Sequence, residues 1–163
     1  GVARLGCKAI YEKYKESYPG LALAMENSQR ATLSEEITYG DIYKATPFTN
    51  SIVIADLRGD EIKNEARYNL TYTGDVDRYS TLIDNTYYTV ALIDYLYYHQ
   101  NIQKKYDYFP SLNGLNPVFH GEYETYPADL TFDYVKNVLN GNVNAADYTS
   151  SAAGFDLYGN PER

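Results

Sequence analysis

The chain has 163 residues, 44% of them hydrophobic, and its 14 Lys and Arg are outnumbered by 22 Asp and Glu, for a net charge of −8. This length predicts one domain, residues 1–163, with one sizeable core. The negative charge repels phosphate backbones and acidic lipids, which argues against nucleic acid or a membrane surface as a partner. No apolar run approaches the roughly 18 residues of a membrane span.

The first predicted element is an amphipathic helix that Pro19-Gly20 ends. The single cysteine, Cys7, can form no intramolecular disulfide, and we interpret it as a small core residue. Because the helical pattern already includes Val2, we expect the chain to be a piece of a longer protein. The apolar stripe recurs at spacings of three and four residues, through Ala3, Cys7, Ile10, Tyr14 and Tyr18.

A short apolar strand is predicted next, from Leu21 to Met25, followed by a polar loop over 26–30. The stretch 37–59 is the most informative one. Residues 39–43 carry apolar side chains at helical spacing, and Pro47 stops the pattern, which predicts a short helical turn. From Ser51 to Leu57 the apolar run is too continuous for a strand with one wet face, so it predicts a buried central strand.

Shorter elements follow. A helix is predicted to begin near Asp60, whose carboxylate suits a first turn, and alternation over 67–73 predicts a half-exposed strand. The stretch 84–96 contains a further apolar run, Val90 to Ile93. The 20 tyrosines, against 5 Phe and no Trp, suit half-buried strands, interfaces or stacking on sugars and bases, and their abundance alone does not choose among these.

The last third of the chain gives fewer signals. Residues 103–121 predict an irregular connection, with His120 in a loop. His99 and His120 are the only histidines, and without Cys or His-x-His spacing they predict no metal site. A helix is predicted over 130–139, capped by Asn140-Gly141, and about 142–163 is predicted to be a loop-like tail. The residues placed on one face of that helix are Thr131, Tyr134, Val135, Val138 and Leu139.

The order of motifs in the middle of the chain carries a resemblance. Ile-Thr-Tyr-Gly-Asp-Ile-Tyr, a spacer, Pro-Phe-x-Asn, an aliphatic strand and Leu-x-Gly-Asp-Glu-Ile follow one another without a gap from Ile37 to Ile62. This order resembles the C-terminal domain of the 5'-nucleotidase and 2',3'-cyclic-nucleotide 2'-phosphodiesterase family, which includes UDP-sugar hydrolases. The resemblance implies an α+β fold, a mixed β-sheet with packed helices.

The resemblance also implies where a nucleotide would bind. In the family, an Asn-Gly-Gly-Gly-x-Arg loop follows the first strand; here Arg30 matches its Arg, while Glu26, Asn27 and Ser28 stand where glycines are expected. Tyr95 matches an aromatic that stacks on the base, and Asn101 replaces an Asp within a Gly-Gly-Asp motif. Arg30, Tyr95, Asn27 and Asn101 are therefore the candidate substrate-binding residues. Glycines let a ligand approach the main chain closely, because they have no Cβ. Since these glycines are missing here, we expect a degenerate or retuned pocket. From the residues alone, Arg30 equally suits a surface ion pair and Tyr95 the rim of the core.

The implied function is that of a non-catalytic substrate-specificity domain. No metal-binding constellation, catalytic triad or phosphate loop is visible in this chain, so it is not expected to catalyse a reaction alone. The resemblance implies a separate N-terminal metallophosphoesterase domain that holds two divalent metals, a nucleotide or nucleoside ligand, no cofactor in this chain, and an extracellular or cell-surface location. The alternative is a Tyr-rich cell-surface module that binds glycan or protein.

Overall fold

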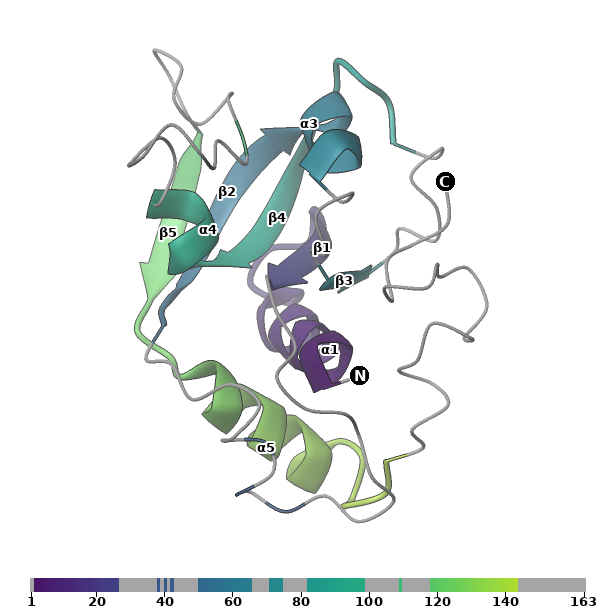
Figure 1. Cartoon of the computed structure of the whole chain (residues 1–163), viewed down its shortest axis with the longest axis vertical. Coiled ribbons are helices and arrows are strands. Elements are labelled where there is room, and N and C mark those ends of the chain that lie inside the picture. The colour runs from purple at the N-terminus through teal and green to yellow at the C-terminus, as the bar shows by residue number, and fades with distance from the viewer. Residues whose placement is uncertain are drawn as a thin grey trace.

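A five-stranded mixed sheet with helices packed against it forms the body of the protein (Figure 1). The computed structural model describes residues 2–26, 38, 40, 42, 50–65, 71–74, 82–98, 109 and 118–143; for 2–4, 64, 65 and 71–74 it describes the backbone. The strand order is β3-β1-β4-β2-β5. The strands are β1 (Leu21–Glu26), β2 (Ile52–Arg58), β3 (Thr71–Gly74), β4 (Tyr87–Ile93) and β5 (Phe119–Tyr123). The expected α+β fold is thereby confirmed.

Pairing within the sheet is both parallel and antiparallel. β1 runs parallel to β4 and antiparallel to β3, whereas β2 runs antiparallel to both β4 and β5. β4 is the middle strand, and β2 lies between it and β5. Four of the first five β2 residues are completely buried, and Leu57 is buried too. The continuous apolar run therefore belongs to an interior strand covered on both faces, as predicted.

Helix α1 (Val2–Tyr14) lies between the sheet and α5 (Pro127–Asn137). Cys7, Ile10 and Tyr14 are buried in the main core cluster, as the predicted stripe requires. A second stripe, Leu5 and Ala9, is buried in a smaller cluster against α5. A helix that packs between two layers buries more than one stripe of side chains. The predicted apolar stripe therefore accounts for the contacts of α1 with the main core but not for its contacts with α5.

The end of α1 differs from the prediction. The helix ends at Tyr14, and Tyr18 lies beyond it in the turn that leads into β1, although Tyr18 N still donates to Tyr14 O at 3.0 Å. Glu26 also differs: it is the last residue of β1 and is buried, not part of a polar loop. Because a carboxyl group is rarely buried in a strand, the sequence pattern predicted that Glu26 belongs to the polar loop after the strand.

The predicted short elements are present where the structure describes them. Gly40 and Ile42 are helical, and Ile42 N donates to Thr38 O at 3.2 Å, which confirms a helical turn there. Helix α3 (Gly59–Glu65) follows β2, and α4 (Asp94–Tyr98) follows β4 directly. Of the strand predicted over 67–73, the described part is β3; residues 66–70 lie outside the described part of the chain.

The C-terminal helix begins three residues earlier than predicted. Pro127 occupies its first turn, where the missing N–H of proline costs no hydrogen bond. The helix ends at Asn137, two residues before the predicted end, and the predicted cap residues follow: Asn140 and Gly141 have φ of 52° and 78°, and Gly141 N donates to Val135 O at 2.8 Å. Val138 was placed on the buried face, but it caps the helix and is 57% exposed. The predicted tail lies outside the described residues from 144 onward.

Strand β5 corrects the prediction of an irregular connection. Phe119 to Tyr123 pair with β2, and His120 lies on this strand and not in a loop. Tyr123 packs against Tyr14, whereas its neighbour Glu122 accepts a hydrogen bond from Tyr98 of α4. Because successive side chains of a strand point to opposite faces, α1 and α4 cover opposite faces of the sheet at this edge.

Candidate functional site

Several strand ends meet at one edge of the sheet. β4 runs parallel to β1, and β5 runs in the same direction as β4 because both are antiparallel to β2. Ile52, the first residue of β2, pairs with Ile93 at the end of β4 and with Tyr123 at the end of β5. The carboxyl ends of β1, β4 and β5 and the start of β2 therefore lie along the same edge of the sheet (Figure 1). The segments that follow these three strands, and the one that precedes β2, leave the sheet there. In sheets with parallel strands such an edge is where ligands usually bind.

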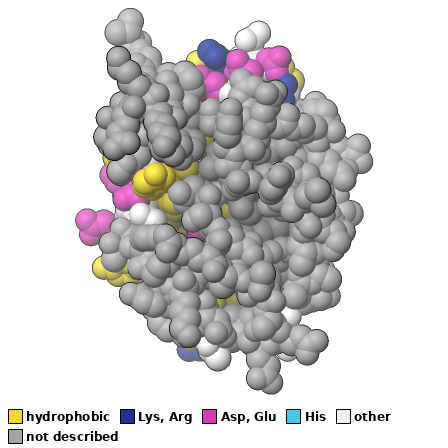
Figure 2. Space-filling model, in the orientation of Figure 1, with side chains coloured by type: hydrophobic (Ala, Val, Ile, Leu, Met, Phe, Trp, Pro, Cys, Tyr) yellow, Lys and Arg dark blue, Asp and Glu magenta, His cyan; other side chains and the backbone are white. Residues whose placement is uncertain are grey.

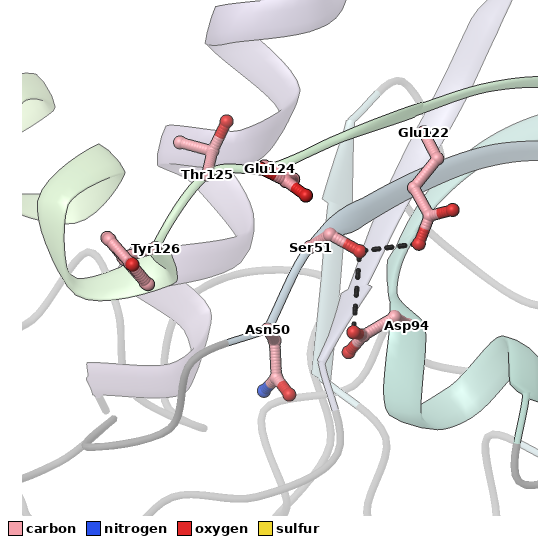
Figure 3. A pocket seen from close by; sticks show the side chains of 7 residues that line it. All are labelled: Asn50, Ser51, Asp94, Glu122, Glu124, Thr125 and Tyr126. Carbon is pink, nitrogen blue, oxygen red and sulfur yellow. Dashed lines mark hydrogen bonds between the residues drawn. The ribbon is translucent and has the colours of Figure 1, made fainter.

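A cleft of about 570 Å³ opens at this edge (Figure 3). Ser51 lies between two carboxylates: its hydroxyl donates to Glu122 Oε1 at 2.6 Å and lies 3.3 Å from Asp94 Oδ2. The backbone holds this arrangement, since Asp94 N donates to Ser51 O at 2.9 Å. The lining residues are Asn50, Ser51, Asp94, Glu122, Glu124, Thr125 and Tyr126.

The second carboxylate oxygen of Glu122 also has a partner. Tyr98 OH donates to Glu122 Oε2 at 2.8 Å. Loss of hydration around Tyr98 and the hydrogen bond to Glu122 raise the pKa of Tyr98 to about 12, so the phenol keeps its proton and remains a donor at neutral pH. Glu122 is thereby fixed by two donors, Ser51 just before β2 and Tyr98 of α4, which orient its carboxylate before any ligand arrives.

The described lining of the cleft is acidic. It contains Asp94, Glu122 and Glu124, and no Lys or Arg is among the described lining residues. Carboxylate oxygens accept hydrogen bonds from hydroxyl and amino groups, whereas they repel phosphate at close range. In chemical terms, these residues suit the sugar hydroxyls or base amine of a ligand better than its phosphate.

Of the candidate substrate-binding residues, the structure describes Tyr95. It lies in the first turn of α4 at the same edge of the sheet and is partly buried against the main core cluster. It is not among the residues that line the cleft. Asn27, Arg30 and Asn101 lie outside the described residues, so a shared site of the four stays a prediction.

Sequence reasoning did not select Ser51, Asp94 or Glu122. Ser51 directly follows the Pro-Phe-x-Asn motif, and Asp94 lies within the apolar stretch 84–96, so both were inside segments already singled out. Glu122 could not have been found, because the strand that carries it was not predicted. Their proximity depends on the register of three strands.

A second polar group lies on the other side of β5. His120 Nε2 is 2.8 Å from Asp56 Oδ1, and Thr89 Oγ1 donates to the same oxygen at 2.8 Å. The ring of Tyr18 lies beside His120, and its hydroxyl contacts that of Tyr123. These contacts link β5, β2 and β4, and they bring no serine or cysteine nucleophile next to the histidine.

In the described part of the chain, no group of three or more His, Cys, Asp or Glu residues could hold a metal ion. Likewise, none of the helices that the structure describes is both long and apolar enough to cross a membrane. Cys7 is completely buried, in agreement with its interpretation as a core residue.

Comparison with known proteins supports the resemblance found in the sequence. Residues 2–67 match the model of the 5'-nucleotidase C-terminal domain. None of the curated proteins matches the chain.

Among solved structures, the chain is similar to a 5'-nucleotidase precursor from Thermus thermophilus, with a TM-score of 0.59 and 20% identity over 84% of this chain and 32% of that one. It is also similar to the NAD nucleotidase of Haemophilus influenzae (TM-score 0.56, 16% identity, 87% of this chain and 30% of that one). A third is a putative 5'-nucleotidase from Staphylococcus aureus in complex with α-ketoglutarate (TM-score 0.54, 13% identity, 83% and 33%).

The chain spans about a third of the length of these structures. At these identities the likeness concerns the fold, and it agrees with the family match over the first helix and the first two strands. The resemblance to the 5'-nucleotidase C-terminal domain is therefore supported twice, by the family match over residues 2–67 and by the shared fold.

Proposed function

We propose that this chain is the substrate-specificity domain of a 5'-nucleotidase-like phosphoric ester hydrolase. In this proposal, residues 1–163 form one domain that binds the nucleoside part of a substrate. Hydrolysis belongs to a separate N-terminal metallophosphoesterase domain that holds two divalent metals, and the whole protein acts in nucleotide catabolism outside the cell or at its surface. The chain itself is then a binding module and not a catalyst.

The observation that supports the proposal best is the convergence of strand ends. The segment that follows β1 in the sequence carries Asn27 and Arg30, and α4, which follows β4, carries Tyr95. Because β1 and β4 are parallel neighbours, both segments start from the same edge of the sheet. The order of the elements therefore suits a ligand site that draws on both.

A retuned pocket is supported by the chemistry of that edge. The glycines expected by resemblance before Arg30 are replaced, and Asn101 stands in place of an acidic residue. The described cleft instead offers Asp94 and Glu122, held by Ser51. We propose that the site selects for hydrogen-bond donors of a nucleoside and gains little from a phosphate.

Ligand-induced thermal stabilisation tests this function. The chain is titrated with adenosine, AMP and UDP-glucose to 10 mM, about a hundred times a Kd of 0.1 mM, where a specific ligand would stabilise the fold by about 2.7 kcal/mol. We expect adenosine to raise Tm at least as much as AMP does. We expect Arg30→Gln to reduce the rise in Tm that AMP produces. Lys8→Gln, which alters an exposed ion pair on α1, is the matched control and should keep the shift. If none of the three ligands raises Tm, the chain has no nucleoside-binding role.

An exposed aromatic cluster favours a second candidate function. The rings of Tyr97 and Tyr98 pack edge to face with centroids 4.8 Å apart, and Phe119 lies 6.0 Å from Tyr97. Tyr98 and Phe119 remain about half exposed, beside the carboxylate of Glu122. Hydrophobic and acidic side chains lie next to one another along the left-hand margin of Figure 2, on the side of β5.

Exposed rings next to fixed acceptors suit stacking on a sugar, so we propose glycan binding as the alternative. Binding of neutral oligosaccharides, weakened by Phe119→Ala and unaffected by Arg30→Gln, would distinguish it from nucleoside binding. Absence of oligosaccharide binding at millimolar concentration would exclude it.

A further inference from the structure

The buried carboxyl group of Glu26 has no role in the proposed function, and its surroundings are unusual. Glu26 ends β1 and is 4% exposed. Its carboxyl group lies against the backbone of α1, since a Cβ added to Gly6 would come within 2.6 Å of Oε2. The hydroxyl of Thr131 on α5 lies on the same side of Gly6. The carboxyl therefore sits where β1, α1 and α5 meet.

No hydrogen bond reaches Glu26 Oε2, the one buried side-chain oxygen or nitrogen without a partner among the described residues. Thr131 cannot serve as a donor, because its hydroxyl donates to Pro127 O at 2.9 Å. A buried carboxylate without donors is far less stable than a buried carboxylic acid. Burial alone accordingly raises the pKa of Glu26 to about 8.

The described residues packed around Glu26 present no charge that would offset its ionisation. Helix α1 presents Gly6, whose titratable neighbour Cys7 belongs to the apolar core cluster. Helix α5 presents Thr131, and β3 places Thr71 opposite Glu26 in the sheet. No described Lys, Arg or His contributes to the pKa of Glu26. The protonation state of this one group therefore decides whether a charge is buried at the junction.

We propose that Glu26 is a proton-dependent packing element: the junction of β1, α1 and α5 is tight with the neutral acid and loosens when the carboxylate forms. The sign follows from linkage. In the unfolded chain Glu26 ionises near its ordinary pKa of about 4.5, whereas in the folded chain it keeps its proton up to about pH 8. Between these values the folded state binds more protons, so stability due to Glu26 is complete below about pH 4.5 and is lost as pH rises to 8.

Glu26→Gln removes the charge and keeps the shape. Over pH 5 to 8, the unfolding equilibrium constant of the wild-type chain should rise relative to that of Glu26→Gln by up to about tenfold per pH unit. As the pH falls, the Tm of the wild type should therefore rise relative to the Tm of Glu26→Gln. Glu16→Gln, at an exposed position beyond α1, is the control and should run parallel to the wild type across this range. A wild-type Tm that runs parallel to that of Glu26→Gln would overturn the proposal.

A direct titration protects the test against a variant that fails to fold. The carboxyl carbon of Glu26 is followed by NMR in the wild-type chain from pH 4 to 9. A chemical-shift change centred near pH 8 is expected. A midpoint near 4.5 would show that the carboxylate forms at no cost, and the proposal would be wrong. Neither measurement involves a nucleoside, so the outcome is independent of the proposed function.

Discussion

Replacing Gly59 by alanine should destabilise the protein strongly, because the backbone of another segment occupies the space of the new methyl group. Gly59 begins α3 directly after β2. A Cβ there would lie 2.2 Å from Ile83 O and 2.9 Å from Ile83 C. Ordinary contacts between such atoms begin at about 3.5 Å, so the two segments would have to separate by about 1 Å.

The magnitude follows from what that separation disturbs. Gly59 N donates to Thr86 O at 2.9 Å and Asp60 N to Asp84 O at 3.1 Å, and Ile83 O itself accepts from Thr86 N. Overpacking typically costs about 1–3 kcal/mol, and each weakened hydrogen bond adds up to about 1 kcal/mol. The lower entropy of the unfolded alanine variant offsets about 0.4–1 kcal/mol. We expect a net loss of about 2–4 kcal/mol.

Urea unfolding followed by far-ultraviolet circular dichroism measures this loss, since the chain has no tryptophan to report by fluorescence. With a slope of about 2 kcal/mol per molar, the midpoint should fall by about 1–2 M. Gly20→Ala is the matched control, because a Cβ at Gly20 would have nothing within 4 Å. It should remain within about 0.5 kcal/mol of the wild type. If Gly59→Ala unfolds together with Gly20→Ala, the contact with Ile83 does not have the consequence argued here.

Three further changes test other parts of the fold. Ile54→Ala, at a completely buried position of β2, should cost about 2–5 kcal/mol in urea unfolding, whereas Val138→Ala, at a mostly exposed position, should cost less than about 0.5 kcal/mol. Gly141→Ala should lower stability by about 1–2 kcal/mol, measured as a fall in Tm, because Gly141 has a φ of 78°. Arg58 donates to Asp60 Oδ1 at 2.6 Å and holds the pKa of Asp60 below its usual range. This contribution is therefore present above about pH 4 and lost in acid, so Arg58→Met should raise the pKa of Asp60 by NMR titration, and the stability difference from the wild type should shrink as pH falls below 4.

The interior of the fold was predictable because burial leaves a direct trace in the sequence. Ile52 to Leu57 are apolar on both faces of β2, and the strand has neighbours on both sides. Strand β5 left no such trace. Phe119, His120, Glu122 and Tyr123 are exposed, and with Gly121 between them they show no alternation of apolar and polar residues. An edge strand needs little apolar surface, so hydrophobicity did not reveal it.

The candidate site was less predictable than the core for a related reason. Asp94 and Glu122 are separated from Ser51 by 43 and 71 positions along the chain, and only the register of β2 with β4 and β5 brings the three together. Glu26 shows the opposite error. Its polarity placed it in a loop, but strand β1 continues through Glu26 and its side chain is buried.

The sheet fixes where ligand-facing segments start, and the segments themselves fix what they can bind. Packing of β1, β4 and β2 requires apolar side chains but sets no requirement on the residues that follow β1 or α4, so the scaffold can be kept while those residues change. The described cleft is negatively charged, because Asp94 and Glu122 share the hydroxyl of Ser51 and face no described cation. A phosphate entering there would need a cation from elsewhere, and by resemblance Arg30 is the residue that could supply it. If Arg30→Gln leaves affinity for AMP unchanged while Glu122→Gln increases it, the cleft itself is the binding site and the segment after β1 is not part of it.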